Sequence, residues 1–109
     1  MTTLSGMTLY ARVAGVTFDN RQAVIAGLVR GAALYIRREP HNPYDANALS
    51  VEHPSGAQIG YLPREMAAQL SPRLDAVGVD HLPATVHILV RGSGPNPTLG
   101  VSIRFTAPI

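Results

Sequence analysis

Short segments separated by glycine- and proline-rich turns make up most of the chain. Ten glycines and nine prolines punctuate 109 residues, and most of the segments between them alternate in polarity or are rich in β-branched residues. This pattern predicts a mainly β fold with two short helices, arranged as a small β-barrel. The predicted strands cover residues 7–13, 33–38, 48–53, 58–62, 82–91 and 99–105.

The first helix is expected between the first two strands. Asp19 and Gln22 form a capping-box pattern at its start, and Gly31 is a plausible residue to end it. The apolar positions between them predict one inward stripe, made of Val24, Ile25, Leu28 and Val29.

The second helix is expected after the fourth strand, with Pro63 in its first turn and an end near Ala76. Pro72 lies inside this pattern, so a kink or a break is predicted there. The inward face would consist of Met66, Ala67, Leu70 and Leu74.

Length and composition limit the classes of protein that are possible. A chain of 109 residues suits one domain, and we expect residues 1–109 to form it as a monomer. We find no apolar run near the ~20 residues that cross a bilayer and no secretory signal pattern, so a cytoplasmic location and no membrane partner are expected. The absence of cysteine excludes disulfides and cysteine zinc sites.

Charge says little about partners. The formal net charge is +2, which permits nucleic-acid binding but falls short of a strongly basic surface.

The segment between the second and third strands holds the densest group of unusual residues. Residues 37–48 read R-R-E-P-H-N-P-Y-D-A-N-A. Proline restricts both itself and the residue before it, while Asp45 and Asn47 can hydrogen-bond to nearby backbone amides. We therefore expect a stiff loop that presents Tyr44, Asp45 and Asn42 to a partner.

Three sequence blocks together resemble the HIRAN domain family. The first is a glycine-and-aromatic segment at residues 13–18, the second is R-E-P-H-N-P-Y-D-A-N-A at 38–48, and the third is I-G-Y-L-P-R-E at 59–65. The resemblance covers about residues 9–77, and residues 82–106 fit the closing strands of the family more loosely. HIRAN domains occur in Swi/Snf-type ATPases and as standalone bacterial proteins, and we expect a bacterial standalone domain here.

The resemblance implies a function and a set of site residues. The DNA-binding eukaryotic members are OB-like barrels that capture the 3′ end of single-stranded DNA. Carried over to this chain, Tyr44 and Phe18 would stack on the terminal base, and Asp45 would accept a hydrogen bond from the 3′-hydroxyl. Asn42 would make a loop or polar contact, and Arg64 would contact phosphate. A DNA-processing ATPase or nuclease is the partner protein that this function suggests.

Two positions depart from the DNA-binding pattern. Thr17 stands where those members have a basic residue, and Tyr61, also a candidate DNA-binding residue, stands where they have a histidine. Arg37, Arg38 and Arg21 are further candidates for phosphate contact. The runner-up interpretation is a protein-interaction or regulatory module that keeps the barrel without binding DNA.

Catalysis and metal binding are the weakest interpretations. Glu39 and Asp45 could pair as acid and base, or join His41 around a metal, but we find no nucleophile, phosphate-binding loop or metal-ligand spacing beside them. We therefore expect a non-catalytic module with no cofactor and no metal, in which Arg38 and Glu39 form an ion pair that braces the loop.

Overall fold

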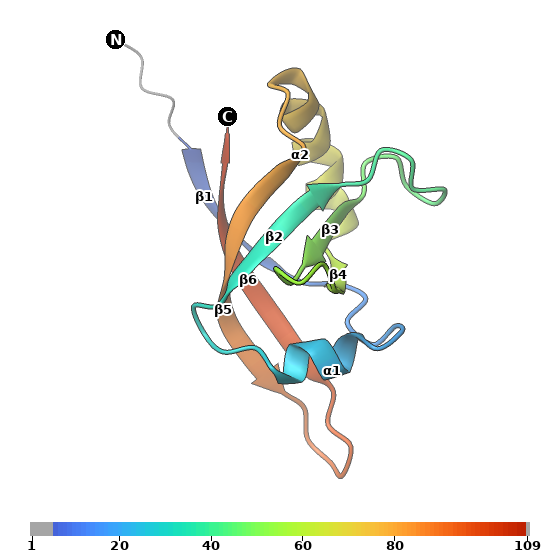
Figure 1. Ribbon diagram of the computed structural model, residues 1–109, viewed down its shortest axis with the longest axis vertical. Coiled ribbons are helices and arrows are strands. Elements are labelled where there is room, and N and C mark those ends of the chain that lie inside the picture. Colours follow the sequence, from blue (N-terminus) through green and yellow to red (C-terminus); the bar gives the residue numbers. More distant parts are fainter. Residues whose placement is uncertain (1–5, 109) are drawn as a thin grey trace.

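The computed structural model describes residues 6–108, in which six strands form one curled antiparallel sheet with two helices (Figure 1). The order across the sheet is β1-β6-β5-β2-β3-β4. The elements, in chain order, are β1 (Gly6–Arg12), α1 (Arg21–Ala26), β2 (Ala33–Arg38), β3 (Leu49–Glu52), β4 (Gln58–Tyr61), α2 (Arg64–Ala76), β5 (His81–Arg91) and β6 (Leu99–Pro108).

Alternation in the sequence decides which face of each strand is buried. In β2, Leu34 and Ile36 are fully buried, whereas Tyr35 and Arg37 point to solvent, as the polarity pattern predicted. The same alternation in β5 and β6 buries Val86, Ile103 and other apolar residues. These side chains face α1 and α2 in one apolar core.

The sheet curls until its two ends approach each other. Ala14, just after β1, and Tyr61 of β4 form a backbone bridge, with N–H donors 2.8 and 2.9 Å from the partner carbonyl oxygens. Gly60 makes this approach possible, because a Cβ at that position would overlap the Ala14 carbonyl oxygen and the Val13 side chain. The prediction of a small, mainly β, OB-like barrel with two helices is confirmed.

Helix α1 is shorter than predicted and is not capped as expected. Asn20 rather than Asp19 precedes it, and Asp19 adopts a positive φ of 52°. Gln22 does not reach back to cap the helix, because its side chain binds the Val16 carbonyl and both backbone groups of Leu99 at 2.7–2.9 Å. The capping-box prediction was therefore wrong: this glutamine ties the loop after β1 to the start of β6.

The predicted end of α1 was also wrong. The helix ends at Ala26 with Gly27 as its C-cap, and Gly31 lies further on, in a turn with a φ of +83°. Ile25 and Leu28 are buried as expected, but Val29 lies beyond the helix and is 65% exposed.

Helix α2 is one continuous helix through Pro72, so the predicted break does not occur. The proline ring is exposed. The neighbouring Ser71 is buried, and its hydroxyl donates a 2.6 Å hydrogen bond to the Asn47 carbonyl. The inward residues Ala67, Leu70 and Leu74 are buried as predicted. In residues 6–108, neither helix is long and apolar enough to span a membrane.

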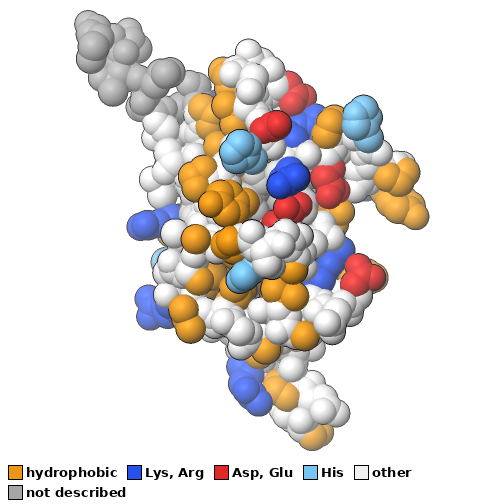
Figure 2. Space-filling view, viewed as in Figure 1, with side chains coloured by type: hydrophobic (Ala, Val, Ile, Leu, Met, Phe, Trp, Pro, Cys, Tyr) orange, Lys and Arg blue, Asp and Glu red, His pale blue; other side chains and the backbone are white. Residues whose placement is uncertain are grey.

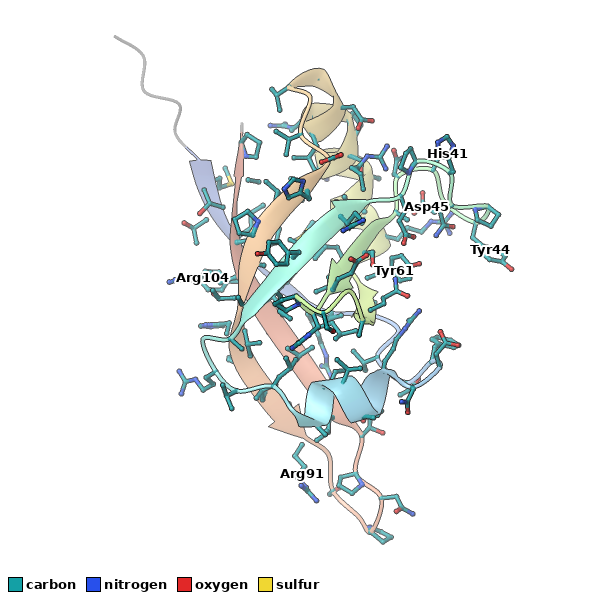
Figure 3. All side chains as sticks on the ribbon, in the orientation of Figure 1. His41, Tyr44, Asp45, Tyr61, Arg91 and Arg104 are labelled. Atoms are coloured by element: carbon teal, nitrogen blue, oxygen red, sulfur yellow. The ribbon has the colours of Figure 1, made fainter. Side chains whose placement is uncertain are left out.

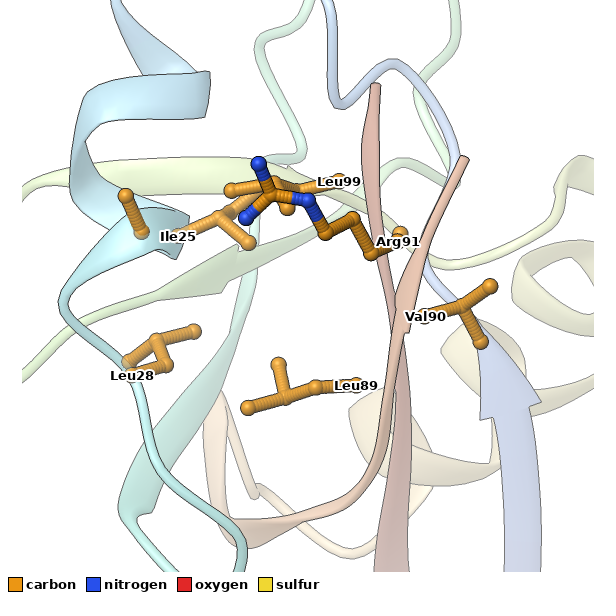
Figure 4. Close-up of a pocket in the computed structure, with 8 residues that line it drawn as sticks. Ile25, Leu28, Leu89, Val90, Arg91 and Leu99 are labelled. Atoms are coloured by element: carbon orange, nitrogen blue, oxygen red, sulfur yellow. The ribbon is translucent and has the colours of Figure 1, made fainter. Parts of the chain in front are cut away.

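A small apolar cavity of about 120 Å³ lies between α1 and the β5–β6 hairpin (Figure 4). Ile25, Leu28, Leu89 and Leu99 line it, and Arg91 reaches over its mouth. The cavity belongs to the end of the barrel distant from the loop that follows β2 (Figure 3).

Candidate functional site

The β2–β3 loop is held in shape by Asn42. Its Oδ1 accepts hydrogen bonds from the backbone amides of Tyr44 and Asp45, at 2.8 and 3.2 Å. Its Nδ2 donates to Glu39 Oε1 at 3.0 Å. One amide side chain thus spans the base and the tip of the loop, which confirms the expectation of a stiff loop.

Asp45 adds a second local brace. Its Oδ1 accepts from the Asn47 amide at 2.9 Å, which is the side-chain-to-backbone contact that the sequence predicted for this position. Its Oδ2 lies 3.7 Å from Arg64 Nε. That separation exceeds a hydrogen bond, so the second oxygen is oriented toward a cation without being tightly bound to it.

The loop is also bound to the barrel through Tyr61. The Tyr61 hydroxyl donates to Glu39 Oε1 at 2.9 Å, and Asn42 Nδ2 lies 3.5 Å from the same hydroxyl. Tyr61 therefore positions the loop base from the edge strand β4, in addition to its place in the barrel-closing bridge.

Tyr44 lies at the tip of the loop and is 89% exposed. Figure 3 shows its ring projecting away from the body of the molecule, with Asp45 closer to the base of the loop. Exposure of such a large apolar ring disfavours a purely structural role, since a ring that covers the core edge would be buried.

Phe18 lies on the neighbouring loop after β1 and is 65% exposed. The guanidinium carbon of Arg21 lies 5.9 Å from the centre of the Phe18 ring and 5.5 Å from that of Tyr61. Arg21 thus joins the Phe18 loop to the residues that support the Tyr44 loop, in the distance range of cation–π contacts.

Arg21 is the residue that the sequence analysis undervalued. It is only 9% exposed, and its guanidinium donates to the Gly15 carbonyl and to Gln58 Oε1, each at 2.7 Å. Its Nε is a buried polar atom that lacks a partner within residues 6–108. Its local neighbours Gly15 and Phe18 come from the same loop, but its contacts with Gln58 and Tyr61 cross to β4, and no local pattern contains those.

Arg38 supports the loop from another direction than predicted. Its Nε and Nη2 donate to the two carboxylate oxygens of Asp75 at 3.0 Å each, and its Nη1 donates to the Ala46 carbonyl at 2.8 Å. The expected ion pair with Glu39 was wrong, because Asp75 on α2 offers a two-point contact and Glu39 binds Tyr61 and Asn42 instead. The Arg38 side chain is 6% exposed.

The contact with Arg38 favours the ionised form of Asp75. Two hydrogen bonds from Arg38 hold the pKa of Asp75 below its ordinary value, and the neighbouring charge acts in the same direction. The Arg64 side chain is 78% exposed, and within residues 6–108 its carboxylate contact is the 3.7 Å approach to Asp45, so its charge is accessible. Across residues 6–108, no three histidine or acidic side chains gather as a metal site would require.

These contacts connect most of the predicted site residues into one strip. Phe18, Arg21, Tyr61 and Asn42 follow one another through direct contacts, and Asn42 holds the backbone of Tyr44 and Asp45. Asp45 in turn faces Arg64. We call these seven residues the loop strip. Arg38 is not part of it but contacts the same loop through the Ala46 carbonyl.

Comparison with known proteins agrees with this architecture. The family model of the HIRAN domain matches residues 6–106. The chain belongs to the HIRAN domain family.

Similar proteins include the Helicase-like transcription factor of Oryctolagus cuniculus, 50% identical over 40 residues, and that of Homo sapiens, 42% identical over 40 residues. Each match covers 37% of this chain and 4% of the larger protein, so it concerns a small part of those proteins.

Two crystal structures share the HIRAN fold of this chain. The HIRAN domain of human HLTF superposes with a TM-score of 0.65 at 24% identity, over 95% of this chain and 79% of that one. A Lactobacillus plantarum protein superposes with a TM-score of 0.71 at 25% identity, over 94% and 97% of the two chains.

Proposed function

We propose that this HIRAN domain is a non-catalytic module that binds single-stranded DNA and prefers a free 3′-hydroxyl end. Membership of the family supports DNA binding. The observation that carries the finer proposal is the pairing of an 89% exposed Tyr44 with the half-buried, partly unengaged carboxylate of Asp45 on one braced loop.

Tyr44 would supply the stacking surface. Base stacking on an aromatic side chain contributes roughly 1–3 kcal/mol per base, which matters in a domain whose formal net charge is only +2. Phe18, exposed on the adjacent loop, would provide a second surface for the terminal base or for the base before it.

Asp45 would recognise the end itself. Its Oδ1 is engaged with the Asn47 amide, whereas Oδ2 is available to accept a hydrogen bond from a 3′-hydroxyl. A 3′-phosphate in the same place would bring negative charge against the carboxylate and would be rejected. Arg64, beside Oδ2, would contact the nearest phosphate of the strand, so a terminal nucleotide would replace the loose Asp45–Arg64 pair with two better contacts.

The test is fluorescence anisotropy at low salt with three matched single strands: one with a 3′-hydroxyl, one with a 3′-phosphate and one circular. We expect preferential binding of the 3′-hydroxyl strand, with affinity of about micromolar order because few phosphates are contacted. Asp45→Ala should lose that preference. Asp45→Asn is the matched control for loop shape, since it retains an oxygen for the Asn47 amide but removes the charge.

The protein-interaction alternative makes a different prediction. Thr17 in place of a basic residue adds no positive charge to the Phe18 loop. This favours a protein, rather than DNA, as the partner that contacts the exposed aromatic side chains. If none of the three strands binds, the 3′-end proposal fails and the alternative takes its place. A DNA-processing ATPase or nuclease remains the class of partner we propose for the DNA-binding module.

A further inference from the structure

Charge is distributed unevenly over the molecule. All seven acidic residues lie outside β1, β5 and β6. Figure 2 shows the acidic side chains in the centre and on the right of the view, whereas the left edge carries arginine side chains and no acidic ones. Within residues 6–108, β1, β5 and β6 themselves thus carry Arg12, Arg91 and Arg104 and no acidic residue.

Two arginines lie on the outer face of these strands. Arg104 of β6 is paired in register with Tyr10 of β1 on one side and with Thr85 of β5 on the other. Within residues 6–108, no carboxylate lies within 4.0 Å of either Arg104 or Arg12, although Arg21, Arg37, Arg38 and Arg64 all have such partners.

Arg12 occupies the same face one row further along. Its register partner is Ser102, two residues from Arg104. A Cβ on Gly100 would lie 3.6 Å from Arg12 Nη2 and 3.8 Å from Val90 Cβ, and Val90 is an outward residue, 47% exposed. The Arg12 guanidinium therefore lies beside Gly100, over the outer surface of β6.

Aromatic rings accompany these cations. The rings of Tyr10 and His87 lie 4.7 Å apart at 55°, which brings β1 and β5 side chains together across β6. Tyr10 is 53% exposed. We define the arginine face as Tyr10, Arg12, His87 and Arg104. In Figure 3, Arg104 and Tyr44 point to opposite sides of the molecule, so this face is separate from the loop strip.

We propose that the arginine face is a second contact surface for the phosphate backbone of the same DNA strand, away from its 3′ end. This inference rests on the proposed function for its choice of partner. Charge complementarity supports it, because unpaired arginines bind phosphate in a planar, two-point fashion. The exposed ring of Tyr10 beside them would add stacking without sequence preference, as in other single-strand binders.

The experiment uses the full chain and two DNA probes that each report on one surface. A 3′-hydroxyl oligonucleotide of about six nucleotides is too short to extend beyond one OB-type site and reports on the loop strip. A circular single strand has no end and reports on the arginine face. Binding of each is measured between about 50 and 200 mM salt.

We expect Arg12→Gln/Arg104→Gln to weaken binding of the circle and to leave binding of the short oligonucleotide unchanged. Each lost phosphate contact reduces the magnitude of the slope of log affinity against log salt by about 0.7. The slope of the double variant should therefore be smaller in magnitude by about 1.4. Arg104→Gln alone should lose half of that. Arg73→Gln, an exposed arginine of α2, is the control for net charge and should leave the slope unchanged.

Several results would overturn the proposal. The first is a double variant that binds the circular strand as tightly as the unaltered chain does. The second is an unaltered chain that does not bind the circular strand. The third is an Arg73→Gln variant whose salt slope falls as much as that of Arg104→Gln. Binding to phosphatidylserine vesicles that depends on Arg12 and Arg104, with circle binding unaffected, would assign the face to a membrane surface instead. If the short oligonucleotide fails to bind while circle binding depends on these arginines, the 3′-end function fails and the arginine face stands.

Discussion

Substitution of Asn42 tests whether the loop must be ordered in advance for the domain to bind DNA. Asn42→Ala removes three hydrogen bonds, at 2.8, 3.2 and 3.0 Å, that join the loop tip to its base. The side chain is half-buried, so each bond contributes near the lower part of the usual net range of roughly 0.5–1.5 kcal/mol. Together they should favour the ordered loop by about 1.5–2 kcal/mol.

That free energy sets an upper limit on the loss of affinity. If only the ordered loop binds, the apparent dissociation constant rises as the ordered fraction falls, and a loss of about 1.5–2 kcal/mol weakens binding by up to roughly ten- to thirtyfold, a limit reached when the loop without these bonds is mostly disordered. The amide protons of Tyr44 and Asp45 lose their acceptor at the same time. Their hydrogen exchange should therefore accelerate, while exchange in the core strands stays near that of the unaltered chain.

Asn47→Ala is the matched control, because it makes the same chemical change five positions later in the same loop. Within residues 6–108, only the backbone of Asn47 takes part in hydrogen bonds, to Asp45 and Ser71. Its affinity and amide exchange should therefore change little. The reasoning is refuted if Asn42→Ala binds the 3′-hydroxyl strand as tightly as the unaltered chain, or if the two amides keep their protection.

Three further predictions concern single residues. Tyr44→Ala should leave the melting temperature unchanged, because the ring is 89% exposed, yet weaken anisotropy-detected DNA binding by roughly 1–3 kcal/mol; unaltered binding would exclude stacking. Gly60→Ala should lower the free energy of unfolding, measured in urea, by about 1–3 kcal/mol, because the added Cβ collides with the Ala14 carbonyl that closes the barrel. Stability near that of the unaltered chain would contradict this. Because Arg38 lowers the pKa of Asp75 in the folded state, that carboxylate contributes stability above its unfolded pKa and loses it as pH falls through the folded value. Asp75→Asn should therefore unfold with a weaker acid dependence between about pH 5 and pH 2 than the unaltered chain, as followed by circular dichroism; an identical acid profile would argue against the Arg38 contact.

Local patterns in the sequence were sufficient for much of the fold. The alternation of Leu34 and Ile36 with Tyr35 and Arg37 predicted β2 and its buried face, and the structure places all four side chains accordingly. Helix α1 was predicted less well. Gln22 was read as a local cap, but it binds Leu99, 77 residues away in the chain, and no local pattern contains that contact.

The same distinction applies to the candidate site. The hydrogen bond from the Asn47 amide to Asp45 joins residues two positions apart, so residue type and spacing alone determine it. The Arg38–Asp75 and Arg21–Gln58 contacts each span 37 positions. They depend on how far the sheet curls and on which strands become neighbours.

The sequence by itself determined the stiff loop, the alternation of the strands and the resemblance to HIRAN domains, because all three rest on neighbouring residues. Only the tertiary structure decided that Arg21 lies between Phe18 and Tyr61. It also decided that Arg12 and Arg104 share a face, where residues 6–108 place no carboxylate within 4.0 Å of either. The physical reason is strand register. Pairing of β1 with β6 and closure at Ala14 and Tyr61 set which distant side chains meet, and register results from packing of the whole barrel rather than from any single segment.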